Sequence, residues 1–296
     1  MSPTVRPPLS RSSRRVALPN GLALHALEWG ANDPALDHTV VLLHGFLENA
    51  WAWESTVLAG LAGAYHLVSV DFRGHGDSDR VGTGGEYHIS DYLGDLHDLL
   101  PLVGRARVSL VGHSLGGAVA GLYAGAMPEG VHRLALLEGT GLPNPGGGPA
   151  RATRWLRERE RQRGRPQRSY ASVEEAAARL RETDPALDAG LALTLAEKGT
   201  GIGPDGRRRF KHDPRLTAGR PEAFDPELAR RFWAEVRCPV LIVEGERSEI
   251  RLSPEEGARR WSAFRNWRHV VVNGAGHMIQ RDQPAAVAAL LREFLG

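Results

Sequence analysis

Ser114 stands between glycines at the point where one apolar run passes into another. Residues 108–125 read VSLVGHSLGGAVAGLYAG, a strand-like run followed by a helix-like run of small residues. A strand that turns sharply into a helix strains the turn residue and presents its side chain beside the helix N-terminus. Gly112, Gly116 and Gly117 give the clearance that such a turn needs. The segment therefore predicts that Ser114 is a nucleophile, with the positive helix end aimed at a developing oxyanion.

A serine nucleophile needs a base, which is usually a histidine held by a carboxylate. Of the twelve histidines, His277 is the best candidate. The stretch VVVNGAGHMIQRDQP puts it in a glycine-rich loop between the last apolar run and the last helical segment, at the sheet edge where we also expect Ser114. His44, His75 and His113 stand beside glycines in turn motifs, and we interpret them as loop-shaping residues.

The sequence predicts no metal and no other cofactor. No pair of histidines has HExxH or comparable metal-ligand spacing. The glycines of GTGIGPDG at 199–206 do not follow a strand and open a helix, as a dinucleotide site requires. The sole cysteine, Cys238, begins an apolar run and is interpreted as a small buried hydrophobe, so a disulfide framework is excluded.

Short apolar runs along the chain predict the strands that position these residues. They cover 22–29, 38–43, 65–70, 107–111, 132–138, 239–244 and 268–272. From the third run on, they alternate with helical segments such as 90–103 and 282–295. Apolar runs separated by helices indicate an α/β fold, with a mostly parallel sheet covered by helices on both faces. The first two runs predict an antiparallel edge hairpin around Pro19-Asn20-Gly21.

Residues 141–236 differ from the rest of the chain in composition and in hydrophobic pattern. They contain GLPNPGGGPA, eight arginines between 151 and 168, and the helix-like SVEEAAARLRET, with no clear strand. We interpret them as a helical lid inserted into a core domain formed by 16–140 and 237–296. Residues 1–15 are basic and rich in Pro and Ser, and we expect a flexible tail there. The arginine cluster is either a solvated helix face or a site for an acidic group of the substrate.

Four segments together resemble the α/β-hydrolase superfamily. They are GHSLG at 112–116, LLHGFLENAWAW at 42–53, DFRGHGDSD at 71–79 and GAGHMIQRDQP at 274–284, and their order spans the whole chain apart from the insertion. HGFLENA, LLEGTGLP, SYASVEEAAARL and KHDPRL are similar to the serine hydrolase-like, esterase-type members. The resemblance implies an oxyanion hole made by the backbone N–H groups of Phe46 and Leu115.

The acid of the predicted triad has two main candidates. Members of the superfamily normally carry Asp after the strand that here reads PVLIVEGERSEI, whereas this chain has Ser248-Glu249. Glu249 lies 28 residues before His277 and is the first candidate. Glu138, 24 residues after Ser114, is the alternative, because some members place a glutamate at the end of that strand. Asp79 or a missing acid is the third option.

We therefore predict a serine hydrolase, a carboxylesterase acting on a small-molecule ester or related acyl substrate through an acyl-enzyme. We call the strand-to-helix turn at Ser114 the elbow. A serine at the elbow argues against relatives of the haloalkane dehalogenases and epoxide hydrolases, which use a carboxylate nucleophile. A C–C bond hydrolase, an acyltransferase and a non-catalytic ligand-binding homologue remain alternatives. The candidate walls of an apolar acyl pocket are Trp51, Trp53, Trp155, Phe210, Phe224, Phe232 and Trp233.

Composition excludes several classes of partner. The chain has 37 Lys and Arg against 35 Asp and Glu, a formal charge of +2 over 296 residues, so nucleic acid is not expected as a partner. No window approaches 18 consecutive apolar residues, so no membrane span is expected. Residues 1–15 also lack the apolar stretch of a signal peptide, which predicts a cytoplasmic location.

Overall fold

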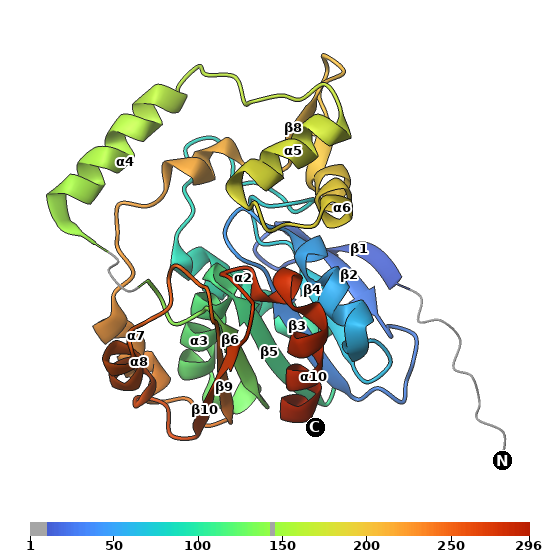
Figure 1. Cartoon of the computed structure of the whole chain (residues 1–296), viewed down its shortest axis with the longest axis vertical. Coiled ribbons are helices and arrows are strands. Elements are labelled where there is room, and N and C mark those ends of the chain that lie inside the picture. The colour runs from blue at the N-terminus through green and yellow to red at the C-terminus, as the bar shows by residue number, and fades with distance from the viewer. Residues whose placement is uncertain (1–10, 143–145) are drawn as a thin grey trace.

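The computed structural model describes residues 11–142 and 146–296, and an eight-stranded sheet forms its centre (Figure 1). The strand order is β1-β2-β4-β3-β5-β6-β9-β10. All neighbours from β4 to β10 pair in parallel, whereas β1 and β2 form an antiparallel edge. The strands are β1 Arg11–Ala17, β2 Ala23–Trp29, β3 His38–Leu43, β4 His66–Val70, β5 Arg107–His113, β6 Leu134–Leu137, β9 Val240–Gly245 and β10 Trp267–Val272. This topology confirms the predicted mostly parallel sheet.

Helices cover both faces of the sheet, because successive strand residues are buried on opposite sides. In β3, Val41 and Leu43 belong to one core, while Val40 and Leu42 belong to the other. The first core is closed by α2 (Ile89–Val103), α3 (Leu115–Ala126), α7 (Pro226–Trp233) and α8 (Pro254–Trp261). The second is closed by η1 (Ala50–Trp53), η2 (Val57–Leu61), α9 (Ile279–Asp282) and α10 (Pro284–Leu295). Each fully buried Val or Leu contributes about 1.5–3 kcal/mol.

The N-terminal edge differs from the prediction. Residues 11–15 of the expected tail form most of β1, and residues 1–10 lie outside the described residues. The turn around Pro19-Asn20-Gly21 exists, but it joins β2 to β1, and β4 separates β2 from the run at 38–43. All of β1 except Val16 is exposed, so this edge strand lacks the apolar alternation that marks a strand in sequence.

The segment 141–236 is mainly helical. It contains α4 (Gly148–Gln162), α5 (Val173–Thr183), α6 (Ala189–Gly199), η4 (Pro214–Ala218) and α7. In Figure 1, α4, α5 and α6 lie beyond one end of the sheet, at the top of the view. The expectation of no strand is wrong, because β7 (Thr200–Ile202) and β8 (Arg208–Phe210) form a hairpin that begins in GTGIGPDG and ends just after it. Three-residue strands are too short to show an alternating pattern.

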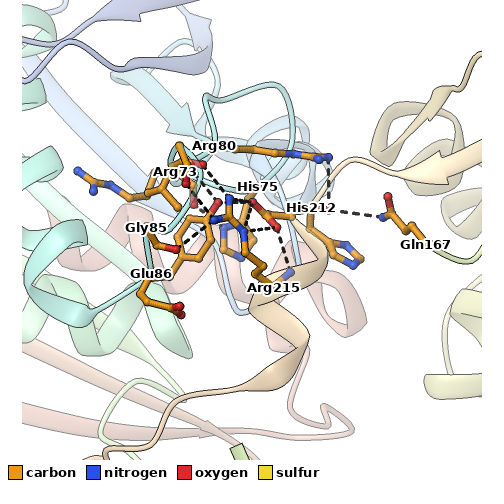
Figure 2. A network of polar contacts seen from close by, with 12 residues as sticks. Arg73, His75, Arg80, Gly85, Glu86, Gln167, His212 and Arg215 are labelled. Atoms are coloured by element: carbon orange, nitrogen blue, oxygen red, sulfur yellow. Dashed lines mark hydrogen bonds and ion pairs between the residues drawn. The ribbon is translucent and has the colours of Figure 1, made fainter. Parts of the chain in front are cut away.

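A polar network anchors this segment to the loop that follows β4 (Figure 2). The buried Asp213 donates its backbone N–H to the carbonyl of Gly74 at 2.7 Å and accepts the Tyr87 hydroxyl at 2.7 Å. Arg215 pairs with Asp213 and donates to the Gly85 carbonyl at 3.0 Å. The chain around η4 is therefore fixed against the sheet domain. Within the described ranges, the structure has no helix with the length and apolar character needed to cross a membrane.

Candidate active site

Ser114 occupies the turn between β5 and α3. Its backbone has φ 50° and ψ −112°, a strained conformation for a residue other than glycine. The Ser114 N–H donates to the carbonyl of Leu137 at 2.9 Å, which ties the turn to the end of the neighbouring strand. The side chain is thus held at the N-terminus of α3, where the helix dipole favours negative charge.

Two of the glycines flanking Ser114 are required by close backbone approach. A Cβ on Gly112 would lie 2.3 Å from the carbonyl oxygen of Gly116. A Cβ on Gly116 would lie 2.3 Å from the carbonyl oxygen of Leu43, at the end of β3. No side chain fits at either distance, so this tight turn depends on glycine at both positions.

His277 faces Glu138 rather than Glu249. The His277 Nδ1–H donates to Oε2 of Glu138 at 3.4 Å, and the Glu138 side chain is 1% exposed. Glu249 is exposed, and no hydrogen bond or ion pair joins it to His277. Asp79 instead binds the edge hairpin through Arg15 and the N–H of Ala23. Of the two main candidates for the acid, the geometry therefore favours the alternative, Glu138, over Glu249.

The carboxylate of Glu138 is oriented by donors from the turn after β9. Its Oε1 accepts the N–H of Gly245 at 2.7 Å, and its Oε2 accepts the Ser248 hydroxyl at 2.7 Å. Ser248 stands in the segment where the resemblance leads one to expect an aspartate. In this chain Ser248 donates a hydroxyl hydrogen bond, and the carboxylate comes from Glu138, the residue after β6, which pairs with β9.

We call residues 44–49, between β3 and η1, the oxyanion loop, because they include Phe46, whose backbone N–H is the first predicted oxyanion donor. Phe46 lines the same cavity as Ser114, as does Leu115, the first residue of α3. Neither backbone N–H has an acceptor among the described residues, so both are available to a ligand oxygen. Leu47 has a φ of 60°, and the Gly45 N–H donates to Glu48 at 2.8 Å, which together fix the course of this loop.

Glu48 and His113 connect the oxyanion loop to the His277 loop. The sequence analysis interpreted His113 as a loop-shaping residue, but it missed Glu48. The His113 Nδ1 lies 2.8 Å from Oε2 of Glu48, and its Nε2 lies 2.9 Å from the His277 carbonyl oxygen. The Gln280 side-chain nitrogen also lies 3.2 Å from Nδ1, so the ring is held from three sides. Burial raises the pKa of Glu48, but His113 and Arg281 outweigh it and hold that pKa well below its usual range. The glutamate of HGFLEN, Glu48, was the sequence feature that could have indicated this role.

His44 and His75 also hold loops, in agreement with their interpretation. The His44 Nδ1 donates to the Gly45 carbonyl at 2.7 Å, and its Nε2 accepts the Phe72 N–H at 3.1 Å. His75 packs edge-on against His44, and burial lowers the pKa of His75 to about 3. Both side chains are completely buried, so they join the turn after β4 to the oxyanion loop from inside the protein.

One group of three possible metal ligands occurs in the described part of the chain, formed by His25, Asp71 and Asp77. The two oxygens of the buried Asp71 already accept the backbone N–H groups of Ala50 and Asp77, and His25 donates to Asp71 at 2.7 Å. Burial alone would raise the pKa of Asp71, but the hydrogen bond from His25 and the nearby positive charge outweigh burial. The pKa of Asp71 therefore lies below its usual value. We interpret the group as a hydrogen-bond network that shapes the turn after β4.

A cavity of about 770 Å³ brings Ser114, His277 and Glu138 together. This volume is in the usual range of small-molecule sites. Much of its wall is apolar, and it also contains charged groups contributed by the insertion. The apolar side chains include Ala118, Leu122, Leu142, Phe224, Leu228 and Ile250; the charged ones from 141–236 are Arg151, Arg220, Glu222 and Asp225.

The predicted tryptophan walls do not line this cavity. Trp53 and Trp233 are buried in the two cores, with 0% and 1% exposure. Trp51 packs beside α6 with Lys198 over its ring, and Trp155 lines a neighbouring chamber. Large aromatic side chains fill cores as readily as they line sites, so their position along the sequence does not distinguish the two roles.

Of the phenylalanines considered as pocket walls, only Phe224 lines the cavity. Phe210 lines a separate cavity of about 230 Å³. Phe232 is half-buried on α7, where its carbonyl lies against Gly125. Arg220, at the cavity wall, was not singled out by any sequence signal.

Comparison with known proteins agrees with this fold. The model of the alpha/beta hydrolase family matches residues 40–290. A serine hydrolase-like protein of Danio rerio is 26% identical over 96% of this chain and 88% of its own length. One of Dictyostelium discoideum is 24% identical over 93% of this chain and 79% of its own length. A hypothetical protein of Pseudomonas aeruginosa, 29% identical, has a TM-score of 0.79 over 96% of this chain and 97% of its own.

The fold and the serine elbow define a protein of the hydrolase class. The chain belongs to the alpha/beta hydrolase family, because the family model covers most of its length.

Proposed function

We propose that this protein is a serine hydrolase that cleaves a carboxylic ester or related acyl compound of low molecular weight. The main support for this proposal is that Ser114, His277 and Glu138 line one cavity. The His277 ring is also hydrogen-bonded to the Glu138 carboxylate. The serine hydrolase-like names of its relatives support the same reaction class.

In the proposed mechanism, Glu138 holds the proton on Nδ1 of His277, so Nε2 is free to act as the base. The Ser114 hydroxyl attacks the ester carbonyl while His277 takes its proton. The N–H groups of Phe46 and Leu115 bind the oxyanion, and each such donor contributes about 3–4 kcal/mol. His277 then protonates the leaving alcohol, and a water activated by His277 hydrolyses the acyl-enzyme and restores Ser114.

The apolar part of the cavity supports an acyl chain as the group bound there. The segment 141–236 contributes Arg151, Phe224 and Leu228 to the wall, which supports its role as a lid. Asp213 and Arg215 anchor its middle, so opening would involve the parts on either side of η4.

The test is covalent labelling with a fluorophosphonate, followed by intact-mass analysis and peptide mapping. We expect one adduct, on Ser114, and none on the folded Ser114→Ala variant. A panel of 4-nitrophenyl esters then measures kcat/KM, and the Ser114→Ala variant should lose about 10⁶-fold in kcat. Folded wild-type protein that neither reacts with the fluorophosphonate nor cleaves any ester would contradict the proposal and favour a ligand-binding homologue.

A further inference from the structure

A side chamber of about 200 Å³ adjoins the catalytic cavity. The two spaces share the wall residues Phe46, His88, Arg151 and Arg220. The chamber is also lined by the rings of Tyr87, Tyr92 and Trp155. Aromatic walls limit access of water, and a charge inside such a space interacts more strongly than it would in bulk solvent.

Arg220 places an unpaired guanidinium in this wall. No hydrogen bond or ion pair joins its side chain to any described residue, whereas nearby Arg73 and Arg159 pair with Asp95 and Glu86. Burial is the main influence that lowers the pKa of Arg220, and the positive charge of Arg151 lowers it further, against Tyr92 and Glu222, which raise it. A partly desolvated cation without a counterion is stabilised by an anion.

Arg151 lies beside Arg220. Its Nε donates to the carbonyl oxygen of Arg220 at 3.0 Å, and both residues line both spaces. Glu86, Asp225 and Glu222, the nearby acidic residues, form no ion pair with Arg220. Glu86 pairs with Arg159, and Asp225 caps α7 through the N–H groups of Glu227 and Leu228. Glu222 is exposed and makes no hydrogen bond or ion pair with the guanidinium.

The backbone that carries Arg220 is held in place. Figure 2 shows Arg215 directed at the 73–86 loop, and its guanidinium donates to the carbonyls of Val81, Gly82 and Gly85. Gly219 has a φ of 75°, a conformation that favours glycine, and it ends η4 immediately before Arg220. The arginine is therefore positioned by an anchored turn, which lowers the entropic cost of binding a ligand.

We propose that the substrate is an acyl compound with a second, anionic group, a carboxylate or phosphate, which Arg220 binds at the side chamber with Arg151 beside it. This inference rests on the proposed function, because the ester carbonyl must lie at Ser114 while the anion lies at Arg220. The anion is not consumed: hydrolysis breaks only the acyl bond and releases an acid and an alcohol or thiol.

Paired substrates test the inference and separate the two anions. The first pair is the 4-nitrophenyl monoester of glutaric acid and 4-nitrophenyl valerate, which differ by an acyl carboxylate. The second is valeryl-coenzyme A and valeryl-N-acetylcysteamine, which differ by phosphates on the leaving group. For the preferred pair, we expect Arg220→Gln to lower kcat/KM about 10- to 100-fold on the anionic member and less than about threefold on the neutral one. Arg220→Lys should keep part of the preference.

Arg157→Gln is the matched control, because Arg157 is an exposed arginine of α4 outside both spaces. It should leave both ratios unchanged. If Arg220→Gln changes neither ratio while ester hydrolysis continues, the inference is overturned and the proposed function stands.

A binding measurement makes the result independent of turnover. The Ser114→Ala protein is titrated calorimetrically with monomethyl glutarate, with methyl valerate and with coenzyme A. Binding of an anionic probe that is lost in Ser114→Ala/Arg220→Gln supports the inference even if wild-type protein fails the fluorophosphonate test. The inference is contradicted if neither anionic probe binds, or if every anionic probe that binds does so equally with and without Arg220.

Discussion

At the scale of single residues, strain is concentrated in the candidate site. Within the described residues, the non-glycine positions with positive φ are Leu47, Ser114 and Glu138. They belong respectively to the oxyanion loop, the elbow and the proposed acid. Such conformations cost about 1–3 kcal/mol each and persist only where the surroundings fix them. For Glu138, the fixing contacts are its N–H to the Val243 carbonyl and the two donors to its carboxylate.

The identity of the acid is tested by two isosteric substitutions. Glu138→Gln should lower kcat about 10³- to 10⁴-fold, because an amide no longer stabilises the His277 imidazolium or its required tautomer. Glu249→Gln should leave kcat within about twofold, since its exposed side chain does not contact His277. Steady-state ester hydrolysis measures both, with circular dichroism to check folding. A large loss in Glu249→Gln alone would reverse the assignment.

Ser248 provides a finer test of the same carboxylate. Ser248→Ala removes a 2.7 Å hydrogen bond to Oε2 of Glu138, the oxygen that also faces His277. Hydrogen bonds to charged groups contribute about 1.5–3 kcal/mol, of which we expect part in the transition state, so kcat should fall about three- to tenfold with little change in KM. Ser248→Thr keeps a hydroxyl and should restore most of the rate. Equal rates for Ser248→Ala and wild type would show that the hydroxyl is dispensable.

At the scale of elements, the β5–α3 turn depends on backbone clearance. In Gly116→Ala the new Cβ would start 2.3 Å from the Leu43 carbonyl, so β3 or α3 must move. We expect a loss of about 1–3 kcal/mol in the free energy of unfolding and a fall in kcat of about 100-fold, because the oxyanion loop follows β3 directly.

Gly94→Ala is the matched control for that substitution. Gly94 is exposed within α2 and has open space around its Cα, so alanine should stabilise the protein by about 0.5–1 kcal/mol without changing kcat. Urea unfolding and ester kinetics measure both variants. A Gly116→Ala protein as stable and active as wild type would exclude the clearance argument.

Elements with a local signal could be predicted from sequence, and the others could not. The apolar runs that became β3, β5 and β9 have periodicity within a few residues, and the glycines around Ser114 report a local steric need. β1 has no such signal, because an edge strand with one buried residue resembles a solvated tail. The strands β7 and β8 also lack a local signal, because three residues are too few to show alternation, although Asp205-Gly206 marks the turn between them.

The choice of acid illustrates a second limit. β6 and β9 are adjacent and parallel, so Glu138 and Glu249 both follow strand ends at one edge of the sheet. Which carboxylate reaches His277 depends on backbone torsions after each strand, and sequence spacing does not encode them. The positions of Trp53, Trp233 and Arg220 are likewise set by long-range packing.

At the scale of the whole molecule, Glu48 links four separate parts of the chain. It accepts from Gly45 in the oxyanion loop and from His113 beside the elbow, and His113 in turn holds the His277 carbonyl. Arg281 lies 3.7 Å from Glu48 and 3.4 Å from Asp184 of the insertion. One buried carboxylate therefore connects the candidate site to the segment 141–236, which contributes residues to the wall of the cavity.

This network predicts a pH-dependent contribution to stability. The folded protein holds the pKa of Glu48 well below its unfolded value of about 4.3, since the neighbouring cations outweigh burial. The stabilisation is therefore complete above the unfolded pKa and is lost as the pH falls towards the folded pKa. Glu48→Gln should cost about 3–5 kcal/mol at pH 7, because it removes the carboxylate that accepts from His113 and leaves Arg281 paired with Asp184 alone. The difference from wild type should shrink below about pH 4.

Urea unfolding of wild type and Glu48→Gln at pH 7, 5 and 3.5 measures that difference. Glu235→Gln serves as control, because Glu235 is exposed on the surface and its substitution should change the free energy of unfolding by less than about 0.5 kcal/mol at each pH. Other buried carboxylates such as Asp71 titrate in both proteins and cancel in the comparison. A wild-type advantage that stays constant from pH 7 to 3.5 would mean that the Glu48 carboxylate stabilises the fold through packing and not through its charge.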